Sequence, residues 1–183
     1  MLEHAQSRFA ERSCASCHFP AAEGGADHSL ASTRNPDAWR RALEVEVRAR
    51  NNAVVFSLRP VEVGHALPTG DLFRRLALHV EWRVDAERVS SATRYLARHF
   101  EPWRHDDGSL NPAYAWPVRD DRVVGEDEFV VEVETDGGAD GGEWVWWVDY
   151  ERVDAREDDR PQDATIASVV RIAEGRLAVA SSP

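Results

Sequence analysis

The sequence lacks an excess of basic residues. Its 22 lysine and arginine residues are outnumbered by 33 acidic ones, which gives a formal net charge of -11 at pH 7. Phosphate binding requires a basic face, so this balance argues against a nucleic-acid partner. The arginines are scattered among acids and form no polybasic patch of the kind that binds membranes.

Long apolar runs, internal repeats and low-complexity segments are missing as well. No run of 18 or more apolar residues occurs, so we expect no membrane-spanning helix. With 43% apolar residues and seven tryptophans, the chain can still bury a sizeable core. Its length fits one domain of ordinary size, or a small module joined to a compact domain.

The apolar pattern changes character near residue 42. Before it we expect a short helix at about residues 2–12, a loop, and a second helix that begins at Asn35 with Pro36 in its first turn. After it apolar residues recur with a period of two, which is typical of strands with one buried face. Such runs are centred on Leu43–Val47, Val54–Leu58, Leu76–Val84, Phe129–Val133, Trp144–Tyr150, 165–172 and 176–180.

This pattern predicts a mainly β fold. Residues 1–42 would be a small helical and loop segment, and residues 43–183 an antiparallel, immunoglobulin-like β-sandwich. The piece from about residue 90 to 121 is rich in proline, tryptophan, histidine and aspartate. We expect it to be a long, irregular excursion from the sandwich, and loops of that length are often functional.

Both cysteines lie in one short motif, Cys14-Ala15-Ser16-Cys17-His18. The pattern C-x-x-C-H is the attachment site of c-type haem. Two thiols add to the two vinyl groups along one edge of the porphyrin, and the two intervening residues set their separation. The histidine that follows then binds the iron as the proximal ligand. The motif therefore predicts one covalent haem c.

Redox, zinc and disulfide roles for the two cysteines fit the residues less well. A thioredoxin-like C-x-x-C belongs at the head of a helix in a βαβ unit, and no such pattern surrounds this one. Structural zinc would need two more ligands; His18 and His28 could serve, but the usual second pair motif is missing. A simple disulfide would leave the role of the histidine open.

A histidine is favoured as the second iron ligand, because the sole methionine is Met1. His28 lies in a Gly/Ala-rich loop long enough to pass round the haem edge, and His65 lies in a shaped turn between two strands. Either would make a bis-histidine haem with a potential on the low side for cytochromes c. The other histidines are weaker candidates: His79 is expected to be solvated on the polar face of a strand, His4 lies near a chain end, and His99 and His105 belong to the excursion.

Two stretches resemble a known family. CASCHFP followed by DHSL is similar to the C-x-x-C-H-M-P and D-H-S-F segments of exported multihaem c-type cytochromes. GHALPTGDLFRRL, with later segments, resembles the β-sandwich module of related multihaem cytochromes. The resemblance implies distal-ligand roles for His28 and His65, and redox partner proteins. This chain has a single attachment motif, which leaves one of the two histidines available to a haem of another chain or segment.

Haem attachment at Cys14 and Cys17 requires export, so we expect a periplasmic or extracellular location. The first residues carry no signal peptide, which implies that the signal was removed or that the residues come from a longer chain.

Three functional hypotheses follow. The first is an electron carrier with a six-coordinate haem. The second is a haem enzyme or gas sensor with an open axial site furnished by Arg98, His99 and His105, although no established catalytic constellation accompanies them. The third is a relay or assembly module of a larger multihaem complex, with Trp103 and Trp116 as surface anchors. Paired acids such as Asp106-Asp107 lack the spacing of a calcium loop, and we expect no second metal site.

Overall fold

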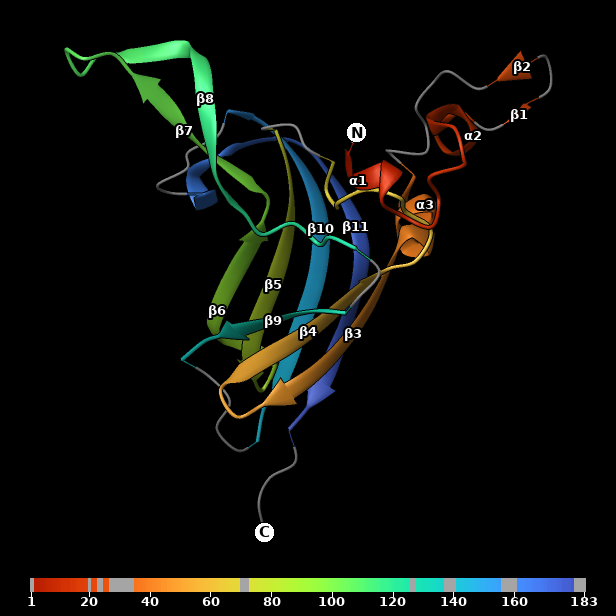
Figure 1. Ribbon diagram of the computed structural model, residues 1–183. Helices are drawn as coiled ribbons and strands as arrows, with labels where there is room; N and C mark the ends of the chain where they lie inside the picture. Colours follow the sequence, from red (N-terminus) through yellow and green to blue (C-terminus); the bar gives the residue numbers. More distant parts are fainter. Residues whose placement is uncertain are drawn as a thin grey trace.

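The computed structural model describes residues 2–19, 21–22, 25–26, 35–69, 73–125, 128–136, 141–155 and 161–179. Most of these residues form antiparallel β-structure, with a small helical segment at the N-terminal end (Figure 1). The predicted fold class is therefore confirmed.

Two sheets pack face to face. The first has three strands in the order β3-β4-β9, and the second has four in the order β11-β10-β5-β6. A three-stranded sheet against a four-stranded one is the architecture of immunoglobulin-like sandwiches. The strand bounds are β3 Leu43–Arg50, β4 Ala53–Pro60, β5 Arg74–Val84, β6 Glu87–Leu96, β9 Phe129–Glu134, β10 Glu143–Ala155 and β11 Thr165–Ala178.

The period-two pattern decides which residues enter the core. On β5 the alternate residues from Leu76 to Trp82 are buried, and on β10 Trp144, Val148 and Tyr150 face the same interior. Strand β4 lies between β3 and β9, and almost every one of its residues is buried. The apolar alternation read from the sequence is thus the inner face of the sandwich.

Two tight turns join neighbouring strands. Asn51 adopts a positive φ of 52° between β3 and β4, which is the left-handed region that asparagine tolerates. Asp85 and Ala86 have φ values of 50° and 68° between β5 and β6. Both connections are antiparallel hairpins. The first joins two strands expected from the sequence, whereas most of β6 lies in the piece expected to be irregular.

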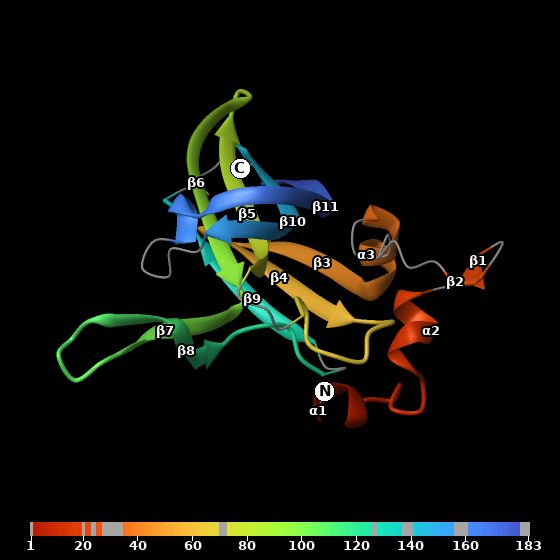
Figure 2. The same ribbon diagram turned by 90° about the horizontal axis from the view of Figure 1, so that it is seen from above.

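The N-terminal segment lies against one end of the sandwich, away from the C-terminus (Figures 1 and 2). It contains α1 (Leu2–Ala5), α2 (Cys14–His18), the short paired strands β1 (Ala21–Ala22) and β2 (Gly25–Ala26), and α3 (Pro36–Ala42). Helix α3 begins as predicted, since Asn35 Oδ1 accepts a hydrogen bond from the Asp37 N–H at 2.9 Å. The first helix is shorter than predicted: it ends at Ala5, and turns follow.

Helix α3 is tied to the sandwich through Trp39. This side chain is buried, and its ring stacks on Tyr150 of β10 at 4.3 Å. The secondary structure changes from helix to strand between Ala42 and Leu43, at the predicted boundary. Whether 1–42 and 43–183 are separate domains stays a prediction.

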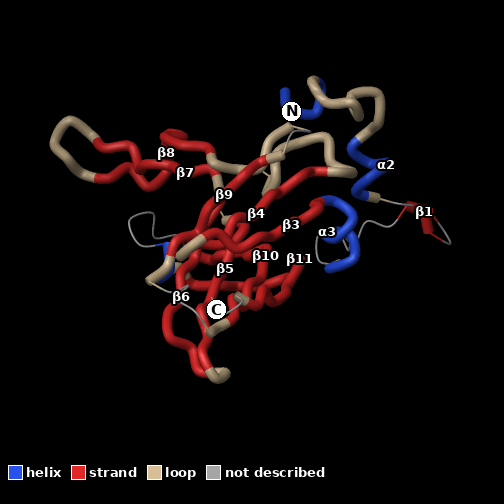
Figure 3. The backbone as a smooth tube through the Cα atoms, turned by 90° about the horizontal axis from the view of Figure 1, so that it is seen from below, coloured by secondary structure: helices blue, strands red, loops and turns tan. Residues whose placement is uncertain are grey.

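The predicted irregular excursion at about 90–121 is wrong. Most of it is regular: β6, then β7 (Arg98–Arg104) and β8 (Leu110–Asp120), which pair as a two-stranded ribbon that projects from the sandwich (Figures 1 and 3). Prolines and two register shifts interrupt the period-two pattern of the ribbon, so the sequence reads as a loop. The runs at 165–172 and 176–180 are predicted as two strands, but residues Thr165–Ala178 form the single strand β11, and residue 180 lies outside the described residues. A short 3-10 helix η2 (Pro161–Asp163) precedes β11.

Candidate functional site

The C-x-x-C-H motif forms the short helix α2. Ser13 caps it, because its side chain accepts a hydrogen bond from the Ser16 N–H at 3.2 Å. Residues three and four apart lie on one helix face, so this conformation places Cys14, Cys17 and His18 on the same side. Both cysteines are exposed free thiols. The motif is therefore accessible for a covalent reaction.

His65 lies in the connection between β4 and β5, and this connection is firmly held. Leu67 and Val123 exchange two backbone hydrogen bonds, at 2.8 and 2.9 Å. Ala66, Leu67 and Pro68 are buried. Such a support fixes the backbone that carries His65, as the sequence analysis expected of a turn between strands.

The tautomer of His65 suits metal binding. Its Nδ1 lies 3.1 Å from the carbonyl oxygen of Ala66. A carbonyl can only accept, so Nδ1 carries the proton in this contact and Nε2 keeps its lone pair. Iron- and zinc-binding histidines are commonly oriented by such a second hydrogen bond.

The structure brings His18 and His65 together. Their ring centroids are 5.9 Å apart and their planes differ by 13°. Both side chains are half-buried. Burial lowers the pKa of His18, and the nearby His65 and Arg74 lower it further. A neutral imidazole is the form that binds a metal.

The separation of the two ring centroids would allow His18 and His65 to bind one iron. With metal–nitrogen bonds of about 2 Å and ring centres roughly 1 Å behind the nitrogens, two imidazoles on opposite sides of one iron have centres about 6 Å apart. Together with the accessible thiols of Cys14 and Cys17, these two imidazoles are residues that could hold a haem c.

Partly buried charges dock the N-terminal segment beside the His65 connection. Glu3 Oε2 accepts a hydrogen bond from the Ala66 N–H at 3.1 Å, and Glu3 Oε1 binds Arg122 at 2.6 Å and Arg98 at 3.3 Å. Partial burial would raise the pKa of Glu3, but these three donors lower it overall. Arg122 is itself almost completely buried and also binds Asp120 at 2.7 Å.

Gly64 makes this docking sterically feasible. A Cβ atom at this position would lie 2.9 Å from Ser7 Oγ, 3.0 Å from His4 Cδ2 and 3.2 Å from Phe9 Cβ. Any larger residue would push the N-terminal segment away from the connection. Glycine next to His65 is therefore part of how His18 reaches its partner.

The remaining candidate ligands fall elsewhere. His28 lies outside the described residues, so its role stays a prediction. His99 binds Asp121 at 2.9 Å, and His105 is exposed at the tip of the ribbon beside Trp103. Arg98 pairs with Glu3 and with Asp120. Trp103 and Trp116, named as candidate anchors, are exposed on the ribbon at 41% and 64%.

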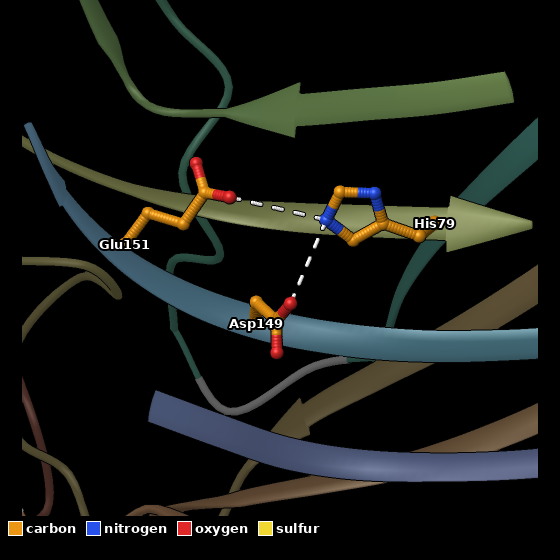
Figure 4. Close-up of side chains that lie close together, drawn as sticks. All are labelled: His79, Asp149 and Glu151. Atoms are coloured by element: carbon orange, nitrogen blue, oxygen red, sulfur yellow. Dashed lines mark ion pairs between the residues drawn. The ribbon is translucent and has the colours of Figure 1, made fainter. Parts of the chain in front are cut away.

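The expectation that His79 is solvated is wrong. This side chain is only 18% exposed, and it lies with Asp149 and Glu151 in a cluster that could hold a metal ion (Figure 4). The expectation of no second metal site stays untested, and this cluster is the candidate that bears on it. Burial lowers the pKa of His79, whereas the charge of Asp149 acts to raise it. The sequence did contain a weak signal: Asp149 and Glu151 alternate with the core residues Val148 and Tyr150, so they share the outer face of one strand.

No family model and no curated protein matches this sequence. Among solved structures, the chain is similar to a penta-heme cytochrome c552 from Thermochromatium tepidum, with a TM-score of 0.58 and 22% identity. The two chains share a fold. The match covers 91% of this chain and 47% of the cytochrome, so the chain spans about half the length of that structure. Among the described residues, no helix is both long and apolar enough to cross a membrane.

Proposed function

We propose that this chain is a c-type cytochrome module for electron transfer, with one haem c attached to Cys14 and Cys17. His18 is the proximal ligand and His65 the distal ligand. The observation that carries the proposal is the His18–His65 pair, with centroids 5.9 Å apart and nearly parallel planes, beside two exposed thiols. The shared fold with a structure described as a penta-heme cytochrome c552 supports it.

Each residue has a defined task in this proposal. The thiols of Cys14 and Cys17 form thioether bonds and prevent loss of the cofactor, which supplies the one-electron chemistry. His18 is presented by the end of α2, and His65 by a connection that backbone hydrogen bonds hold in place. Two imidazole ligands and no methionine put the potential on the low side for cytochromes c.

The setting of the pair favours electron transfer over catalysis at an open iron. With His65 as the distal ligand, both axial positions of the iron would be filled, and none would remain for a substrate or gas. The acidic chain, with net charge -11, suits a redox partner with a basic docking face. Covalent haem attachment implies that the protein works in the periplasm or outside the cell.

A visible spectrum tests the proposal. The chain is produced in a host that matures c-type cytochromes, and spectra are recorded oxidised, reduced, and reduced under carbon monoxide. We expect sharp reduced bands that carbon monoxide does not move. His65→Ala should turn high-spin and bind carbon monoxide, while His105→Ala, which removes an exposed imidazole from the ribbon, should match the unmodified chain.

The possible failures are separable. If His28→Ala turns high-spin and His65→Ala does not, the distal assignment is wrong but the attachment stands. If the unmodified chain binds carbon monoxide readily, the iron is open and the enzyme or sensor hypothesis takes its place. If no covalent haem forms, the whole proposal is wrong.

A second candidate function is a relay module within a larger multihaem assembly. Two observations favour it: the exposed Trp103 and Trp116 on a projecting ribbon, and a structural neighbour about twice the length of this chain. In that case Trp116→Ser should weaken association with the partner without changing the haem spectrum.

A further inference from the structure

His79, Asp149 and Glu151 converge on one point of the four-stranded sheet, on the face opposite the core (Figure 4). His79 Nε2 lies 3.7 Å from Asp149 Oδ2 and 3.9 Å from Glu151 Oε1. Within the part of the chain that the structure describes, this nitrogen is buried and has no hydrogen-bond partner. The two carboxylates are almost completely buried, at 7% and 4% exposure.

Neither tautomer of His79 satisfies Nε2. If Nδ1 carries the proton, it donates to Thr93 Oγ1 at 2.9 Å, and the Nε2 lone pair then faces two carboxylate oxygens. If Nε2 carries the proton, both oxygens lie beyond hydrogen-bond distance. Three potential ligand atoms, all within 4.8 Å of one another, thus lie around one point, and Nε2 makes no hydrogen bond there.

The surroundings fix each of the three side chains. Arg171 Nε donates to Asp149 Oδ1 at 2.5 Å, and Arg75 Nε donates to Glu151 Oε2 at 2.6 Å. Glu151 therefore has one oxygen held by Arg75 and the other directed toward His79. Arg171 contacts both oxygens of Asp149: its Nη2 also donates, at 3.4 Å, to the Oδ2 that faces His79. Thr93 holds the far side of the imidazole, and the Trp147 ring stacks on it at 4.8 Å.

The sheet register places the cluster, and no loop takes part in its ligands. His79 of β5 is paired with Trp147 of β10 and with Thr93 of β6, and Asp149 of β10 is paired with Arg171 of β11. Residues 149 and 151 lie two apart on one strand, so they share a face. A site on paired strands is held more precisely than one on loops.

We propose that these three side chains bind one divalent first-row transition-metal ion, with Zn²⁺ as the probe. Ligands at about 2.0–2.2 Å from a common zinc are roughly 3–4 Å from one another, which matches the distances from Nε2. One imidazole and two carboxylates leave a position for water, and the exposed fraction of His79 gives access. An imidazole ligand favours zinc over calcium or magnesium.

The proposal is independent of haem binding, and the test keeps the two apart. Thiolates bind zinc, so the experiment uses the full chain with Cys14→Ser and Cys17→Ser as its background. Zinc binding is measured by isothermal titration calorimetry, with the zinc-induced rise in melting temperature as a second measurement. Circular dichroism without metal establishes that each variant is folded.

Three variants probe the site. His79→Gln removes the imidazole ligand without changing the buried charges, and we expect at least a tenfold loss of zinc affinity. Thr93→Val leaves all three ligands in place and removes only the orienting hydroxyl; we expect a loss of about tenfold, typical of an outer-shell partner. His105→Ala, on the exposed ribbon, is the matched control and should bind zinc as tightly as the background chain.

The outcomes decide the proposal. One equivalent of zinc, weakened by His79→Gln and by Thr93→Val but not by His105→Ala, supports it. If the background chain binds no zinc, the cluster is a buried ion-pair network and the proposal is overturned. Equal binding by the background chain and by folded His79→Gln also overturns it, because the zinc is then elsewhere.

Discussion

The two histidine sites of this protein are held in different ways. The His18–His65 pair joins a helix of five residues to an interstrand connection, and it depends on a docked N-terminal segment. The His79–Asp149–Glu151 cluster lies on paired strands, with each side chain fixed by a neighbour across the sheet. The first site can therefore be disturbed without unfolding the sandwich. A change at the second site directly affects paired strands of the sandwich.

The largest loss of stability should come from removing one partner of the buried Arg75–Glu151 ion pair. Arg75→Met leaves Glu151 buried without its ion-pair partner, which costs about 3–5 kcal/mol in the free energy of unfolding. Urea denaturation measures it. Arg59→Met is the matched control, because its pair with Glu44 is about half exposed and should cost about 1 kcal/mol or less. Similar losses of stability in the two variants would show that the buried ion pair stabilises the fold no more than the exposed one.

Gly64→Ala should cause a smaller loss of stability, and its structural effect should be confined to the N-terminal segment that carries His18. The new Cβ would meet Ser7, His4 and Phe9, so the N-terminal segment must shift, at about 1–3 kcal/mol. The same shift moves His18 relative to His65, so the reduced haem bands should broaden while zinc binding at His79 stays unchanged. Adding Ser7→Ala removes the nearest atom and should restore part of both properties. An unchanged spectrum would mean that docking does not set the pair.

The docking charges predict a dependence of stability on pH. Burial acts to raise the pKa of Asp120, but hydrogen bonds from Arg122 and Arg98 lower it to about 2. A carboxyl whose folded-state pKa lies below its unfolded value stabilises the fold at pH values above about 4, and this contribution is lost as the pH falls toward 2. Asp120 is about one-third exposed, so we expect about 1 kcal/mol after solvent screening.

Asp120→Asn measures that contribution. The variant should be less stable than the unmodified chain at pH 6, and the difference should shrink as urea midpoints are followed down to pH 2.5. Asp106 is exposed, and Asp106→Asn serves as the control. A constant gap between Asp120→Asn and the unmodified chain over the whole range would contradict the prediction.

The smallest expected effect is a gain of stability from a substitution outside both histidine sites. Ala86 has a φ of 68°, a left-handed conformation that costs an alanine roughly 1 kcal/mol and a glycine almost nothing. Ala86→Gly should therefore raise the free energy of unfolding by about 0.5–1 kcal/mol, with haem spectrum and zinc affinity unchanged. Ala49→Gly, in an exposed part of β3, should instead lower stability by about 0.5–1 kcal/mol. If Ala86→Gly and Ala49→Gly both lower the stability, the argument from the left-handed conformation of Ala86 is wrong.

The sequence predicted well wherever a regular pattern or a local motif decides the structure. The alternation along Leu76–Val84 and Trp144–Tyr150 identified core strands, and Asn35-Pro36 marked the start of α3. It failed on the β7–β8 ribbon, because Pro102, Pro117 and the register shifts hide a strand pattern that only cross-strand pairing reveals. His79 was misread for a related reason: the outer face of a strand was taken as solvent, although neighbouring strands and side chains bury it.

The sequence by itself determined the attachment motif at Cys14, Cys17 and His18, and the inner faces of the sandwich strands. These features depend on spacings of two, three and four residues, which the chain fixes locally. Only the tertiary structure decided that His65 is the partner of His18, and that His79 meets Asp149 and Glu151. Those residues are far apart in the sequence, and their approach follows from docking and strand register, which no local pattern encodes.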